Sequence, residues 1–148
     1  MLADDDEDDC FLFKDALEQL ALSVSLTTVK NGEALMQLLN EKNGRLPDVL
    51  FLDLNMPRKN GIDCLLEIKS NENLKQFPVV IFSTSLSPEV VGQVYKNGAH
   101  YYIRKPNEFG QLKKLIYKAL TLTAQAGNIQ PPIEKFVLPP ETFYNENK

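Results

Sequence analysis

The sequence contains little cysteine and no excess of basic residues. Its two cysteines, Cys10 and Cys64, have no nearby cysteine or histidine partners, which argues against a zinc knuckle or a disulfide framework. Basic residues number 16 against 20 acidic ones, and the net charge of -4 argues against a nucleic-acid-binding surface. The sequence therefore disfavours small domains held together by zinc or disulfides, and it disfavours basic nucleic-acid-binding proteins.

The sequence also lacks long apolar runs and glycine-rich loops. No apolar run approaches the length of a membrane span, and the N-terminus lacks the basic start of a signal peptide. No glycine-rich phosphate loop follows any apolar run, which disfavours a nucleotide-binding protein. The length of 148 residues and the 43% hydrophobic content suit one globular domain and hardly two. We therefore expect a cytoplasmic protein with reduced thiols that does not bind a membrane or nucleic acid.

Short apolar runs alternate with segments of helical periodicity along most of the chain. A very short first strand ends at Ala3, and further strands are predicted at 24–30, 48–54, 78–83 and 100–104. Helices are predicted over 8–22 and after each later strand, where apolar residues recur at spacings of three and four. Strands and helices that alternate in this way form right-handed crossovers. The sequence therefore predicts an α/β fold with a doubly wound parallel sheet.

The two ends of the chain depart from this pattern. The first strand has only Met1 to Ala3, which leaves its neighbours short of partners unless the native start lies upstream. Residues 125–148 contain two proline pairs and no helical period, so we interpret them as an extended tail. Several apolar side chains of this tail could dock on a surface of the domain: Ile133, Phe136, Val137, Phe143 and Tyr144.

Polar side chains come at the ends of four of the five predicted strands. In chain order they are Asp4, Asp5, Asp6, Asp53, Ser83, Thr84 and Lys105. The carboxyl ends of parallel strands meet at one edge of a sheet, where open α/β proteins bind their ligands. We therefore expect these groups to lie close together.

This set of groups suits the transfer of a phosphoryl group. Carboxylates in one pocket repel one another unless a cation or protons neutralise them. Ligands that are all oxygen favour a hard cation such as Mg²⁺, which often binds together with phosphate. With such a cation on one side and the Lys105 ammonium on the other, Asp53 could act as a nucleophile toward phosphorus.

Four motifs carry a resemblance to a known family: "LADDDEDD", "LFLDLNMPRKNG", "VVIFSTS" and "NGAHYYIRKP". Together they resemble the receiver domain of bacterial response regulators, the CheY-like superfamily, over residues 2 to 124. The chain is most similar to the single-domain type that includes the regulators of cyanobacterial phytochromes. The resemblance implies a flavodoxin-like (βα)5 fold with strand order 2-1-3-4-5. It also implies a receiver domain at 1–124 that is separate from the tail at 125–148.

The resemblance implies a metal site and a phosphoacceptor at the carboxyl edge. Asp53 would be the phosphoacceptor. Asp4 and Asp5 would position Mg²⁺, with Asp53 and the main-chain carbonyl of Asn55 as the remaining protein ligands.

The resemblance further implies how the site responds to phosphorylation. Lys105 would bond a phosphoryl oxygen, aimed by a cis Lys105–Pro106 peptide bond. Ser83 would turn toward the phosphoryl group, and Tyr102 would fill the space that Ser83 leaves. The face built by the fourth helix, the fifth strand and the fifth helix would then change its binding preference.

Structural interpretations compete with some of these roles. Asp8 and Asp9 are expected to form the acidic first turn of a helix, with Asp6 or Asp8 as its cap. Tyr101 offers a second ring beside Tyr102. His100 is expected at the surface, and the two cysteines are expected to be small apolar residues.

The expected function is that of a stand-alone response regulator in a two-component phosphorelay. It would accept the phosphoryl group from a histidine kinase or a histidine phosphotransfer protein and signal by protein–protein contact, including as a homodimer. Such a protein is a switch and not a metabolic enzyme, although it takes part in phosphotransfer and in its own dephosphorylation.

The residues argue against two alternatives. A haloacid-dehalogenase-type phosphatase would need a second Asp at the position where this sequence has Asn55. A pseudo-receiver would have the same fold but would be regulated without phosphate, and the intact set of Asp5, Asp53 and Lys105 argues against it.

Overall fold

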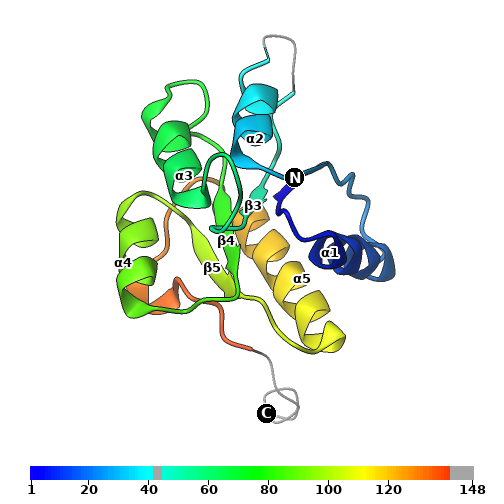
Figure 1. Cartoon of the computed structure of the whole chain (residues 1–148). Helices are drawn as coiled ribbons and strands as arrows, with labels where there is room; N and C mark the ends of the chain where they lie inside the picture. Colours follow the sequence, from blue (N-terminus) through cyan, green and yellow to red (C-terminus); the bar gives the residue numbers. More distant parts are fainter. Residues whose placement is uncertain (42–44, 141–148) are drawn as a thin grey trace.

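The protein is built around a parallel sheet with helices on both faces (Figure 1), and the computed structural model describes residues 1–41 and 45–140. The strands are β1 (Leu2–Ala3), β2 (Thr28–Val29), β3 (Leu50–Leu52), β4 (Val79–Ser83) and β5 (Tyr101–Arg104). The helices are α1 (Glu7–Gln19), α2 (Gly32–Leu39), α3 (Gly61–Ser70), α4 (Pro88–Lys96), α5 (Phe109–Ala126) and the 3-10 helix η1 (Ile133–Lys135). The strand order is β2-β1-β3-β4-β5, which confirms the predicted fold and order.

Alternate residues of each central strand face opposite layers of helices. In β4, Val79 and Ile81 pack with the side chains of α2, α3 and α4, whereas Val80 and Phe82 pack with those of α1 and α5. Both faces of the sheet are therefore buried, which is why these strands are continuous apolar runs in the sequence.

Three helices begin at a side-chain cap that the sequence supplies. Asp6, Asn31 and Asn60 each accept a hydrogen bond from the backbone N–H three residues on, at 3.0, 2.7 and 2.9 Å. These caps satisfy amide groups that have no partner inside the helix. The caps therefore help to determine where α1, α2 and α3 begin.

Helix α1 and strand β2 are shorter than predicted. The strand predicted at 24–30 contains only Thr28–Val29, and the helix predicted over 8–22 ends at Gln19. The strand is short because β2 is an edge strand, and its partner β1 offers only Leu2 and Ala3 for pairing. Helix α1 ends where Ala21 adopts a positive φ of 54°.

The C-terminal segment, residues 127–140, packs against the edge of β5. Tyr102 donates its N–H to the carbonyl of Phe136 at 3.0 Å and accepts from the N–H of Leu138 at 2.9 Å. Phe136 is fully buried, whereas Ile133 is 46% exposed. The predicted docking of the tail is therefore confirmed for Phe136 and wrong for Ile133, and Phe143 and Tyr144 lie outside the described residues.

Candidate phosphoacceptor site

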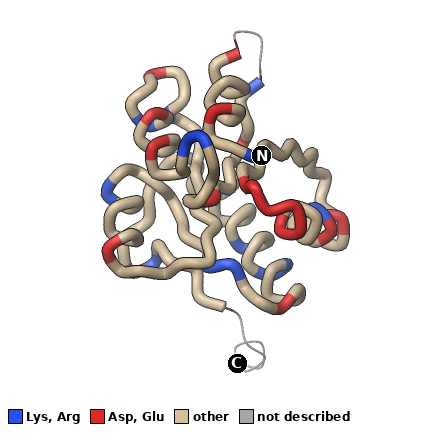
Figure 2. Tube along the Cα trace, viewed as in Figure 1, with Lys and Arg blue, Asp and Glu red and all other residues tan. Residues whose placement is uncertain are grey.

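Neighbouring strands bring the predicted acidic residues together. Asp4 and Asp53 follow β1 and β3 at the same level, because Ala3 pairs with Leu52 and the Asp53 N–H donates to the Ala3 carbonyl at 2.9 Å. Figure 2 shows the acidic run of residues 4–9 as a continuous stretch that leads from the N-terminal strand into α1. The parallel register therefore places two carboxylates side by side from residues 49 positions apart.

Three carboxylates form a compact cluster at this edge. One oxygen of each of Asp4, Asp5 and Asp53 lies within 4.8 Å of the other two. Asp4 is fully buried and Asp53 is 5% exposed, whereas Asp5 faces solvent. Apart from its ion pair with Lys105, Asp4 Oδ2 accepts no hydrogen bond from the described residues. A cluster of oxygens without enough donors is a suitable environment for a hard divalent cation.

Lys105 places its ammonium among these carboxylates. Its backbone N–H donates to the Ser83 carbonyl at 2.8 Å, which continues the β4–β5 pairing to the strand end. Its Nζ lies 2.8 Å from Asp4 Oδ2 and 3.6 Å from Asp53 Oδ2. Burial alone would lower the pKa of Lys105, but its carboxylate partners raise the pKa above the usual range. The ammonium is therefore a permanent positive charge in the site.

Asp53 lies in an environment that disfavours its charged form. Burial raises the pKa of Asp53 to about 6, the Lys105 ammonium opposes this rise, and the Asp4 carboxylate adds to it. The Asn55 N–H donates to Asp53 Oδ1 at 3.3 Å, which favours the carboxylate. A carboxylate that is ionised at neutral pH but poorly solvated is a suitable nucleophile.

Ser83 and Tyr102 both lie in the core beside the site. Ser83 is fully buried, and its Oγ accepts from the Ser85 N–H at 3.2 Å. The Tyr102 hydroxyl donates to the Ser85 carbonyl at 2.5 Å. Tyr101 packs in the opposite layer, with the side chains of α1 and α5. Of the two rings, it is therefore Tyr102 that contacts Ser85.

The Tyr102 ring lies in the core. It is fully buried against Phe136 of the C-terminal segment, with ring centroids 6.2 Å apart. The resemblance implied that this ring moves inward only after Ser83 turns. In this conformation the ring is already buried, and it contacts Phe136 and the Ser85 carbonyl.

Two predictions about individual residues are wrong, and the prediction for Asp9 is confirmed but incomplete. The Lys105–Pro106 peptide bond is trans, and it is the ion pairs of Lys105 that fix the direction of its side chain. His100 is 3% exposed and not at the surface, because the C-terminal segment covers it and Asn128 contributes a carbonyl 2.9 Å from its Nε2. Asp9 is not only part of a helix turn, since its Oδ2 lies 2.8 Å from Lys105 Nζ.

The contact of Asp9 with Lys105 was missed although the sequence contains a signal for it. Asp9 precedes Phe13 by four residues and Ala16 by seven, so it shares the inner face of α1 with these buried positions. An acidic residue on an otherwise apolar helix face indicates a partner at the end of that face. Because residues 4–9 are all acidic, the position of Asp9 on the buried face of the helix was not recognised from the sequence.

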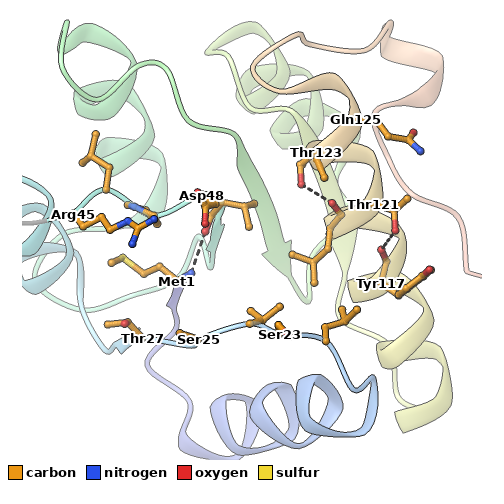
Figure 3. Close-up of a pocket in the computed structure, with 17 residues that line it drawn as sticks. Met1, Ser23, Ser25, Thr27, Arg45, Asp48, Tyr117, Thr121, Thr123 and Gln125 are labelled. Atoms are coloured by element: carbon orange, nitrogen blue, oxygen red, sulfur yellow. Dashed lines mark hydrogen bonds between the residues drawn. The ribbon is translucent and has the colours of Figure 1, made fainter.

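A cavity of about 980 Å³ lies at the other end of the sheet and does not belong to this site (Figure 3). It is lined by residues before β2 and β3 and by the second half of α5, with Arg45 and Asp48 as its charged residues. Met1 borders it, and its ammonium donates to the Val49 carbonyl at 3.0 Å. Burial lowers the pKa of this ammonium. The carboxylate cluster is therefore separate from this large cavity.

Comparisons with known proteins agree with the geometry. The family model "Response regulator receiver domain" matches residues 1–117. The chain is 32% identical to the probable methanogenesis regulatory protein FilR2 of Methanothrix harundinacea over 119 residues, which cover 78% of this chain and 77% of the relative. It is 31% identical to the response regulator Rcp1 of Synechocystis sp. over 120 residues, covering 78% of this chain and 82% of Rcp1.

Solved structures show the same similarity. The phosphorylated cyanobacterial phytochrome response regulator RcpA superposes with a TM-score of 0.74 at 32% identity, covering 82% of this chain and 89% of that chain. The Mn²⁺-bound form of Rcp1 superposes with a TM-score of 0.76 at 28% identity, covering 88% and 96%. No helix in the described part of the chain has the length and apolar character needed to cross a membrane. The chain belongs to the response regulator receiver domain family.

Proposed function

We propose that Asp53 accepts a phosphoryl group from the phosphohistidine of a histidine kinase or of a histidine phosphotransfer protein. The observation that carries this proposal is the position of the buried Asp53 carboxylate, which lies 3.6 Å from the Lys105 ammonium and beside Asp4 and Asp5. An Asp53 oxygen attacks phosphorus as the phosphorus–nitrogen bond breaks, and the imidazole leaves with the electron pair. The Lys105 ammonium neutralises charge on the phosphoryl oxygens.

The carboxylate cluster fits a divalent cation, and we assign Mg²⁺ to it. Asp4, Asp5 and Asp53 would hold the ion together with the Asn55 carbonyl. When bound, the ion offsets the negative charge of the transferring phosphoryl group. The all-oxygen donor set of the cluster supports this assignment, as does the crystallisation of Rcp1 in an Mn²⁺-bound form.

Phosphorylation would act on Ser83 and Tyr102. A phosphoryl group adds acceptor oxygens and charge next to the buried Ser83 hydroxyl, which then turns to donate a hydrogen bond. That turn would break the hydrogen bond from the Ser85 N–H and loosen the loop whose carbonyl holds Tyr102. The binding preference of the surface formed by α4, β5 and α5 would shift as a result. The protein therefore acts as a phospho-accepting switch that also dephosphorylates itself.

The α4, β5 and α5 surface proposed for partners includes the outer edge of β5, which the C-terminal segment covers. The C-terminal segment pairs with Tyr102 at the outer edge of β5. A homodimer that pairs at this edge would have to displace the segment, whereas one formed through the outer faces of α4 and α5 would not. If the homodimer pairs at the β5 edge, deletion of residues 127–148 changes self-association, and an unchanged mass in solution would contradict pairing at this edge.

One experiment tests the phosphoryl transfer itself. The protein is incubated with Mg²⁺ and acetyl phosphate, and the intact mass is measured before and after treatment with hydroxylamine, which cleaves acyl phosphates. We expect the mass of one phosphoryl group to appear in the parent chain and to disappear with hydroxylamine. No gain in the parent, or an equal gain in Asp53→Ala, would refute the proposal.

A further inference from the structure

Lys105 is held by a carboxylate that does not belong to the metal cluster. Its Nζ lies 2.8 Å from Asp9 Oδ2 and 2.8 Å from Asp4 Oδ2, but 3.6 Å from Asp53 Oδ2. The Lys105 side chain is 10% exposed and that of Asp9 is 30% exposed. An ion pair of this partial burial is screened less than one on the open surface. Asp9 therefore draws the ammonium toward α1.

The position of Asp9 is itself well determined. Its backbone N–H donates to the Asp6 side chain at 3.0 Å, which caps α1. One residue further on, Cys10 Sγ donates to the Asp4 carbonyl at 3.4 Å and fastens the helix start to the end of β1. The Asp9 carboxylate thus projects from a helix turn whose backbone is fixed on both sides.

Asp4 faces a competition that Asp9 does not. The proposed cation and the Lys105 ammonium both need Asp4, and two positive charges on one carboxylate repel each other. A cation that binds Asp4 weakens the Asp4–Lys105 pair, whereas Asp9 lies outside the cluster of Asp4, Asp5 and Asp53 and keeps its own pair.

We propose that Asp9 is a positioning residue, which holds the Lys105 ammonium beside the phosphoacceptor and out of the cation site. Without the Asp9 carboxylate, the ammonium would move toward Asp4 and Asp53 and occupy the space between them. The cation would then have to displace it. The inference rests on the proposed function, because it assigns Lys105 and the cluster to one phosphoryl-transfer site.

The test is a calorimetric titration of the full chain with Mg²⁺ alone. We expect Asp9→Asn to weaken Mg²⁺ binding by about fivefold or more, a change typical of the loss of one partly buried charge pair. Asp8→Asn is the matched control, since Asp8 is exposed in the same helix turn and loses the same charge. Asp8→Asn should change the affinity by less than about twofold. Asp9→Glu, which keeps the carboxylate, should restore most of the affinity.

Thermal unfolding of the same variants separates positioning from helix stability. Both Asn variants remove one acidic residue from the first turn of α1, so a purely structural role predicts similar losses of stability and no difference in Mg²⁺ affinity. Equal Mg²⁺ affinity in Asp9→Asn and Asp8→Asn would overturn the inference, and so would a parent chain that does not bind Mg²⁺. Failure of phosphoryl transfer with Mg²⁺ binding intact would instead refute the proposed function alone.

Discussion

The ring of Phe136 packs edge-on against the ring of Tyr102, 34 residues earlier in the chain, with centroids 6.2 Å apart. Phe136 makes a second edge-on contact with Tyr95 of α4, at 5.0 Å. The C-terminal segment therefore reaches the inner side of the α4–β5 surface, where the proposed switch residue lies. Edge-to-face pairs of this kind add to the stabilisation that burial of the rings provides.

Replacement of Phe136 by Ala should release the C-terminal segment from β5. Removal of a buried Phe ring costs about 3–5 kcal/mol in a protein core, and the segment can avoid part of this cost by detaching. The Tyr102 and Leu138 N–H groups, which bond across this contact, should then exchange with solvent deuterium faster. Hydrogen exchange measured by NMR checks this. Ile133→Ala, at an exposed position of the same segment, should leave both rates unchanged, and equal effects would contradict the role of Phe136.

Two glycines should respond in opposite ways to replacement by alanine. A Cβ at Gly61 would lie 2.2 Å from the Asp53 carbonyl oxygen and 2.7 Å from the Leu54 Cα, both of them backbone atoms. Gly61→Ala should therefore lower the free energy of unfolding by about 1–3 kcal/mol and slow phosphorylation of Asp53.

A Cβ at Gly92, inside α4, meets nothing within 4 Å. Gly92→Ala should raise the free energy of unfolding by about 1 kcal/mol. Urea denaturation measures both, and a tolerated Gly61→Ala would show that the Asp53 backbone can shift.

The raised pKa of Asp53 predicts a pH dependence of stability in the absence of divalent cations. Burial raises the pKa of Asp53 to about 6, from an ordinary value of 3.8 in the unfolded chain. Between these two values the folded protein binds more protons than the unfolded chain, so the free energy of unfolding should fall as pH rises from about 4 to about 6. Asp53→Asn lacks this fall and should be more stable than the parent at pH 7. Thermal unfolding with a chelator present checks this, and identical pH profiles for the two proteins would disprove it.

Asp5 and Asp4 should differ in what their removal costs. Asp5 is exposed, so Asp5→Asn should weaken Mg²⁺ binding by about tenfold or more with a change in stability below about 0.5 kcal/mol. Asp4 is fully buried and paired with Lys105, so Asp4→Asn should also destabilise the fold. Mg²⁺ titration and urea denaturation of both variants separate the two effects. A loss of stability in Asp5→Asn as large as in Asp4→Asn would show that Asp5 has a structural role.

The order of the elements, the sheet and the residues at the strand ends followed from the sequence alone. Apolar runs such as 78–83 report that both faces of a strand are buried, and helical spacing reports which face of a helix is buried. Because parallel strands all end at one edge, Asp53 and Lys105 had to converge on Asp4 once the strands were placed. These inferences use only neighbouring residues and the rules of chain connection, so one sequence suffices for them.

Other features were decided only by the packing of distant segments. Whether Asp9 reaches Lys105 depends on how α1 lies over the sheet, and whether His100 is buried depends on where residues 127–140 pass. The length of β2 depended on its partner β1, and the burial of the Tyr102 ring involves Phe136. Each of these contacts joins residues at least 25 positions apart in the sequence, and local periodicity contains no information about such contacts. Local patterns thus determined which elements form, whereas tertiary packing decided which of their side chains meet.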